Sequence, residues 1–162
     1  MMNILNAKQD LLDYANNLND RYLLSKTVDE TYFEPGLMEN LEQYRGEYKD
    51  GQNIIILRVE AKGLRYDNRT KNLDRIKVGD SVDIIRDSEN QYNSNNFKIK
   101  NRNDSLGNLP AELCNVLAPL YDAGYATILT STVSYVEYLK DRSRYAKQGI
   151  MFMELTIRMR GI

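Results

Sequence analysis

Apolar side chains recur with a helical period near the start of the chain. Leu11, Ala15 and Leu18 follow one another at three- or four-residue spacing, which places them on one face of an α-helix. The pattern predicts a helix over about residues 7–22. Asn6, just before it, is a residue type that can accept a hydrogen bond from the first helical turn and so serve as the N-cap.

The next stretch, residues 25–50, has no sustained period. It contains the turn sequence Glu34-Pro35-Gly36 and is rich in acidic residues and tyrosines. Proline followed by glycine is typical of turns and loops. We therefore predict a loop here, with one short helix around residues 37–44.

From Asn53 onwards the pattern becomes that of β-strands. A short apolar run is typical of a buried strand, and alternation of apolar with polar residues is typical of a half-buried one. Strands are predicted at residues 54–59, 81–86, 96–100, 125–139 and 149–160, a helix between Pro110 and Gly124, and a basic loop at residues 140–148.

This order of elements predicts a mainly β fold with helices, of the α+β class. Many short strands around one inserted helix favour a small β-barrel. The length of 162 residues suits one domain plus an extension. We predict a helical N-terminal extension over residues 1–50 and a barrel domain over residues 51–162.

Composition argues against several classes of function. The chain has no histidine, and its single cysteine is Cys114. An intrachain disulfide is therefore impossible, and the usual thiolate and imidazole metal sites and histidine-based catalysis have no residues to build on. We predict a non-catalytic protein without cofactor or metal. Because no segment approaches the roughly 20 apolar residues of a membrane span and residues 1–17 do not resemble a signal peptide, we expect it in the cytoplasm.

The charges are distributed unevenly along the chain. Residues 1–60 carry 6 Lys and Arg against 11 Asp and Glu, whereas residues 61–110 carry 10 against 7. A local excess of cations is what a phosphate-binding face requires, although the net charge is only −1. The central segment is therefore the part in which we look for a nucleic-acid site.

Four blocks of the central segment stand in a characteristic order. They are Gly63-Leu64-Arg65-Tyr66, Val78-Gly79-Asp80, Arg86 to Asn93, and Leu106 to Pro110, and the helix that follows ends in Leu117 to Gly124. Together these blocks resemble the HIRAN domain family, in its stand-alone bacterial or mobile-element form. The resemblance covers about residues 60–124 and implies an OB-like or SH3-like barrel that captures the exposed end of a single DNA strand.

The resemblance also implies which residues contact nucleic acid. In the implied site Arg65 grips a phosphate, Tyr66 and Tyr92 stack on or flank bases, Asn90 and Asn93 hydrogen-bond the terminal nucleotide, and Asn108 belongs to the same set. Stacking on an aromatic side chain is worth about 1 to 3 kcal/mol per base. We expect these side chains to converge on one open, positively charged pocket.

Simpler interpretations exist for the same residues. The tyrosines could pack across neighbouring strands, and Asn90 and Asn93 could only shape a turn. The sequence also departs from the family pattern, because Asn93 stands in place of an Asp and Gln91 in place of a Pro. An amide oxygen accepts a hydrogen bond but lacks the charge that strengthens it.

Two functions follow from these patterns. The first is a binding module for single-stranded DNA or DNA ends in repair, replication or defence. The second is a protein-interaction module, in which the acidic residues 25–50 dock a protein partner or cover the groove. A nuclease or other enzyme has no local motif in its support.

Overall fold

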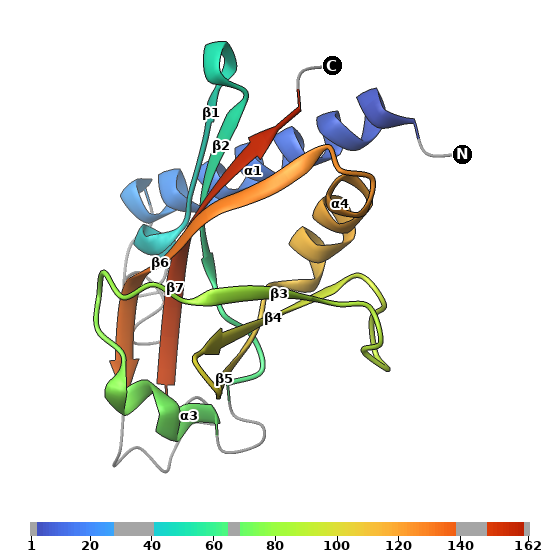
Figure 1. Ribbon diagram of the computed structural model, residues 1–162. Coiled ribbons are helices and arrows are strands. Elements are labelled where there is room, and N and C mark those ends of the chain that lie inside the picture. The colour runs from blue at the N-terminus through green and yellow to red at the C-terminus, as the bar shows by residue number, and fades with distance from the viewer. Residues whose placement is uncertain (1–2, 28–40, 65–68, 139–148, 161–162) are drawn as a thin grey trace.

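The computed structural model describes residues 3–27, 41–64, 69–138 and 149–160. It confirms a mixed α+β fold with an N-terminal helix (Figure 1). Its helices are α1 (Ile4–Thr27), α3 (Arg69–Asn72) and α4 (Ala111–Asp122), and its strands are β1 (Arg45–Lys49), β2 (Ile54–Glu60), β3 (Asp83–Asp87), β4 (Asn96–Asn101), β5 (Asp104–Asn108), β6 (Ala126–Tyr138) and β7 (Gly149–Met159). Short 3₁₀ helices occupy Asp50–Gln52 and Leu73–Arg75.

The strands form two antiparallel sheets. The larger has the order β1-β2-β7-β6, and the smaller has the order β3-β4-β5. Within the described residues the two sheets are joined by isolated bridges, between Lys62 and Asn108 and between Ser81 and Thr132, and by a few more backbone hydrogen bonds from residues 79–82 to β6. Because each bridge is one residue pair rather than a continuous ladder, the described strands do not close into the barrel that the sequence led us to expect.

The N-terminal helix is present as predicted and is longer at both ends. The side-chain oxygen of Asn3 accepts a hydrogen bond from the Asn6 backbone N–H at 3.2 Å. Asn3 therefore caps the first turn, and the prediction that Asn6 is the N-cap was wrong. Leu11 and Leu18 are fully buried or nearly so, and the helix packs on β1, β2 and α4 (Figure 1).

Strand β1 was missed, because its residues lie in the stretch predicted to be a loop. Alternate positions of β1 face α1, and one of them is Gly46, where an added Cβ would overlap the backbone carbonyl of Ala15. The helix and the strand approach so closely that no larger residue fits. The apolar alternation that marks a strand is therefore replaced here by glycine, and the pattern could not reveal it.

The strands that the sequence predicted are confirmed as β2, β3, β4, β6 and β7. In β7 the five alternating residues Met151, Met153, Leu155, Ile157 and Met159 are all buried. Strand β7 lies between β2 and β6 and pairs with both along its length. This central position gives the sheet a continuous apolar inner face. The basic loop predicted at residues 140–148 lies outside the described residues.

Helix α4 begins after Pro110 and is followed by Gly124, as predicted. Cys114 is fully buried within it, and burial raises the pKa of its thiol. The thiol therefore stays protonated, as expected of a small apolar residue. Among the described residues, neither a helix suited to crossing a membrane nor a group of three metal-ligating side chains is found.

Candidate nucleic-acid interface

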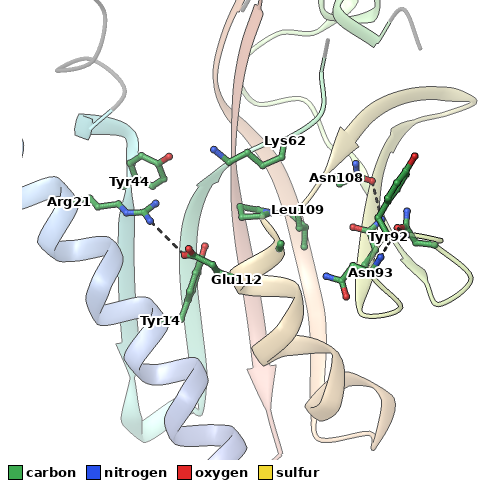
Figure 2. A pocket seen from close by; sticks show the side chains of 13 residues that line it. Tyr14, Arg21, Tyr44, Lys62, Tyr92, Asn93, Asn108, Leu109 and Glu112 are labelled. Carbon is green, nitrogen blue, oxygen red and sulfur yellow. Dashed lines mark hydrogen bonds and ion pairs between the residues drawn. The ribbon is translucent and has the colours of Figure 1, made fainter. Parts of the chain in front are cut away.

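A groove of about 470 Å³ crosses the molecule between α1 and the loop that joins β3 to β4. A volume of this size is typical of ligand pockets. Figure 2 shows its lining side chains, which converge from elements far apart in sequence. The lining residues are Tyr14, Arg21, Tyr44, Lys62, Asn90, Tyr92, Asn93, Asn96, Asn108, Leu109, Pro110, Ala111 and Glu112.

Four of the six predicted contact residues lie in this groove. They are Asn90, Tyr92, Asn93 and Asn108, and we call the part of the groove that they line the asparagine end. The other two, Arg65 and Tyr66, lie outside the described residues. The structure thus brings the described members of the set together, while their role in binding stays a prediction.

The loop of the asparagine end is shaped by its own side chains. The Asn90 Oδ1 atom accepts hydrogen bonds from the backbone N–H groups of Tyr92 and Asn93, each at 3.0 Å. Asn93 Oδ1 accepts in the same way from the Asn95 N–H. These are side-chain turns that asparagine forms readily. The interpretation that Asn90 and Asn93 shape a turn is therefore confirmed.

A buried amide network holds this loop against the smaller sheet. Asn96, which is 6% exposed, donates from Nδ2 to Asp87 Oδ2 and to Asn108 Oδ1, each at 3.0 Å. Asn90 Nδ2 donates to the same Asp87 oxygen at 3.1 Å. These hydrogen bonds, that from Asn96 first, hold the pKa of Asp87 below its ordinary value of 3.8.

This network also fixes the orientation of Asn108. Its Oδ1 faces Asn96, so its Nδ2 points away from the network, and no hydrogen-bond partner of that nitrogen occurs in the part of the chain that the structure describes. Asn108 lines the groove. Its amide nitrogen is therefore a donor available to a ligand.

Arg86 anchors the loop from behind. Its guanidinium forms a two-point pair with Asp122 at 2.9 and 3.0 Å and donates to the backbone carbonyls of Ser94 and Asn96. It also lies 5.4 Å from the centroid of the Phe97 ring. A two-point arginine pair fixes geometry as well as charge. Arg86 thus holds the loop to the end of α4.

Tyr92 is the most exposed large apolar side chain of the described chain. Its exposed fraction is 88%, and Figure 2 shows its ring standing at the edge of the groove. The interpretation that Tyr92 packs across neighbouring strands is thus wrong. An aromatic ring presented to solvent on a rigid loop is available for stacking.

The opposite end of the groove carries residues that the sequence did not single out. Arg21, Tyr44, Lys62 and Glu112 form what we call the cationic end. Arg21 Nη2 lies 3.7 Å from Glu112 Oε2, and Lys62 Nζ lies 3.2 Å from the buried carboxylate of Glu60. Each of these two cations is therefore partnered by an acid.

Tyr44 supports the cationic end. Its hydroxyl donates to Glu60 Oε2 at 3.2 Å, and its ring packs edge-on against Phe152. Burial, followed by the charge of Glu60, raises the pKa of Tyr44 to about 12. The hydroxyl therefore stays protonated and remains a donor to that carboxylate.

The two ends of the groove are joined through the backbone. Lys62 and Asn108 exchange two hydrogen bonds, of 2.8 and 2.9 Å. Gly107 permits this approach, because a Cβ there would overlap the Lys62 carbonyl. Residues directly opposite in an antiparallel pair project to the same side. One cation is therefore placed beside the asparagine end.

Comparisons with known proteins identify the class. The model of the HIRAN domain family matches residues 54–148. The solved HIRAN domain of human HLTF is 27% identical, with 63% of this chain and 74% of that chain covered and a TM-score of 0.47. A solved protein from Lactobacillus plantarum is 25% identical, with 62% and 91% covered and a TM-score of 0.47. No curated protein matches the sequence.

The family match extends over more than half of the chain. The protein therefore belongs to the HIRAN domain family. HIRAN domains are nucleic-acid-binding domains. The asparagine end of the groove lies within the matched residues, whereas α1 and Tyr44 lie before them.

Proposed function

We propose that this protein is a non-catalytic module that binds single-stranded DNA, at or near a strand end, through the groove. The observation that supports the proposal is the convergence of Asn90, Tyr92, Asn93 and Asn108 on one groove within the HIRAN-matched residues. The role in repair, replication or defence is proposed on the family resemblance alone, and the cytoplasmic location on the sequence features described above.

The chemistry of the asparagine end suits an unpaired nucleotide. A base at a strand end has an exposed face, which can stack on the exposed ring of Tyr92. The Asn108 amide nitrogen can donate to a base edge or a phosphate oxygen. Because the buried network around Asn96 already fixes the loop, little conformational entropy is lost on binding.

The charges of the site predict that DNA affinity depends only moderately on salt concentration. Lys62 is in the groove, and Arg65 is the predicted phosphate ligand. Two phosphate contacts on a single strand give a slope of log K against log salt of about −1.4, since each contributes about −0.7. Binding is thus expected to weaken with salt less steeply than that of a strongly basic protein.

The test is a fluorescence titration with a linear DNA strand, the same strand with each end blocked in turn, a circular strand and the equivalent RNA. We expect the open linear strand to bind best and Tyr92→Ala to weaken it about tenfold or more through lost stacking. Tyr92→Phe is the matched control, because it keeps the ring. Equal affinity for circular and linear strands would refute end recognition, and full affinity of Tyr92→Ala would refute the groove as the site.

A second candidate function is a protein interaction through residues 25–50. One observation favours it, because β1 lies within this stretch and is an edge strand of the larger sheet. Edge strands can pair with an extended segment of a partner. Such a partner would bind Tyr92→Ala as well as the unchanged protein, whereas DNA would not.

Removal of residues 1–50 would not separate the two functions. The segment contributes Leu11, Ala15, Leu18 and Tyr44 to the buried core. A truncated chain would therefore lose apolar packing over one face of the sheet. Single substitutions at exposed positions are the sharper tool.

A further inference from the structure

Arg21 is the charged residue among the groove-lining residues that precede the family match, the others being Tyr14 and Tyr44. It belongs to α1, which precedes the matched residues 54–148. Its side chain nevertheless lines the groove and points toward Glu112 at the start of α4 (Figure 2). The helix that sequence analysis assigned to an extension therefore forms one wall of the site.

Arg21 is also held more firmly than an ordinary surface arginine. Its guanidinium carbon lies 4.9 Å from the centroid of the Tyr44 ring, which Glu60 and Phe152 hold in place. Stacking covers a face of the guanidinium and leaves its N–H edge available. The group is thus oriented toward the groove before any ligand arrives.

The present partner of that N–H edge is easily exchanged. The closest contact between Arg21 and Glu112 is 3.7 Å, and the two side chains are 44% and 76% exposed. Exposed ion pairs of this kind contribute little stability. A phosphate offers arginine stronger, two-point hydrogen bonds, so it can displace the carboxylate.

We propose that Arg21 is a phosphate contact supplied by the N-terminal helix, which exchanges Glu112 for the backbone of the bound strand. Glu112 acts as a competitor for the same cation. The strand then runs from Tyr92, past Lys62, to α1. This inference rests on the proposed function and adds to it the path of the strand and a further cation besides Lys62 and Arg65.

The test measures affinity against salt for Arg21→Gln, Glu112→Gln and the double variant, with DNA strands of increasing length. We expect Arg21→Gln to weaken a long strand about tenfold and to make the salt slope shallower by about 0.7. The shortest strand that still binds Tyr92 should be unaffected. Glu112→Gln should strengthen binding about two- to fivefold, and this gain should vanish in the double variant.

Arg75→Gln is the matched control, because Arg75 pairs with Asp104 at 3.2 Å outside the groove. Thermal unfolding of each variant checks that the fold is kept. If Arg21→Gln matches the control in affinity and slope while Tyr92→Ala still loses binding, the inference is wrong and the proposed function stands. If the unchanged protein binds no strand, both fall.

Discussion

The two ends of the groove are built in different ways. At the asparagine end, neighbouring residues of one loop bond to one another, and a buried amide and an anchored arginine hold them in place. At the cationic end, α1, α4 and the segment that follows β2 supply the charged side chains, and the Arg21–Glu112 ion pair that connects α1 to α4 is exposed. The first end is rigid and local, and the second depends on the packing of distant elements.

Under the proposed function, the asparagine end would select the nucleotide and the cationic end would hold the phosphate backbone. A loop fixed by its own hydrogen bonds can present Tyr92 and Asn108 in one orientation, as selection of a nucleotide requires. Cations that exchange partners can follow a flexible phosphate backbone. Substitutions at the two ends should therefore have different consequences for stability and for binding.

The largest expected effect comes from separating α1 from the sheet. Gly46→Val places a branched side chain against the Ala15 backbone, and we expect a loss of about 3 kcal/mol in the free energy of unfolding. Glu47→Val is the matched control, because Glu47 faces the other side of β1 and is exposed. Urea unfolding measures both. If Gly46→Val were as stable as the control, α1 would not be packed as described.

The next largest effect on stability should come from loosening the asparagine end. Arg86→Lys keeps the charge but loses the two-point pair with Asp122 and the bonds to the loop carbonyls. We expect a loss of about 2 kcal/mol in unfolding free energy and weaker DNA binding, because the loop that carries Tyr92 loosens. Arg75→Lys, at an exposed ion pair, should change stability by less than about 0.5 kcal/mol. Unchanged binding by Arg86→Lys would show that the loop does not need this anchor.

Sequence patterns revealed the elements whose signals are local. The alternation of β7, the apolar stripe of α4 and the cluster around Asn90 each lie within one stretch of chain. Those positions were predicted because periodicity and turn chemistry act over a few residues. The resemblance to a known family then connected them to one function.

The cationic end could not be found in this way. Tyr14 and Arg21 are seven residues apart and therefore share a helix face, but nothing in the pattern shows that this face borders Lys62. That placement arises from the approach of α1 to Gly46 and from the Lys62–Asn108 bridge. The predicted barrel is not confirmed for the same reason, because closure of a barrel depends on which strand edges meet.

The smallest expected effect is a loss of stability at acidic pH, and it arises at the asparagine end of the groove. Hydrogen bonds from Asn96 and Asn90 lower the pKa of Asp87 in the folded protein. Its contribution to stability is therefore present above the pKa of the unfolded chain and is lost as pH falls through the lower, folded value. We expect the unfolding free energy to decrease as pH drops below the ordinary value of 3.8. Asp87→Asn should start from a lower stability at neutral pH and lack this part of the decrease. Urea unfolding at several acidic pH values makes the comparison, and parallel curves for the two proteins would show that Asp87 does not hold the loop through its charge.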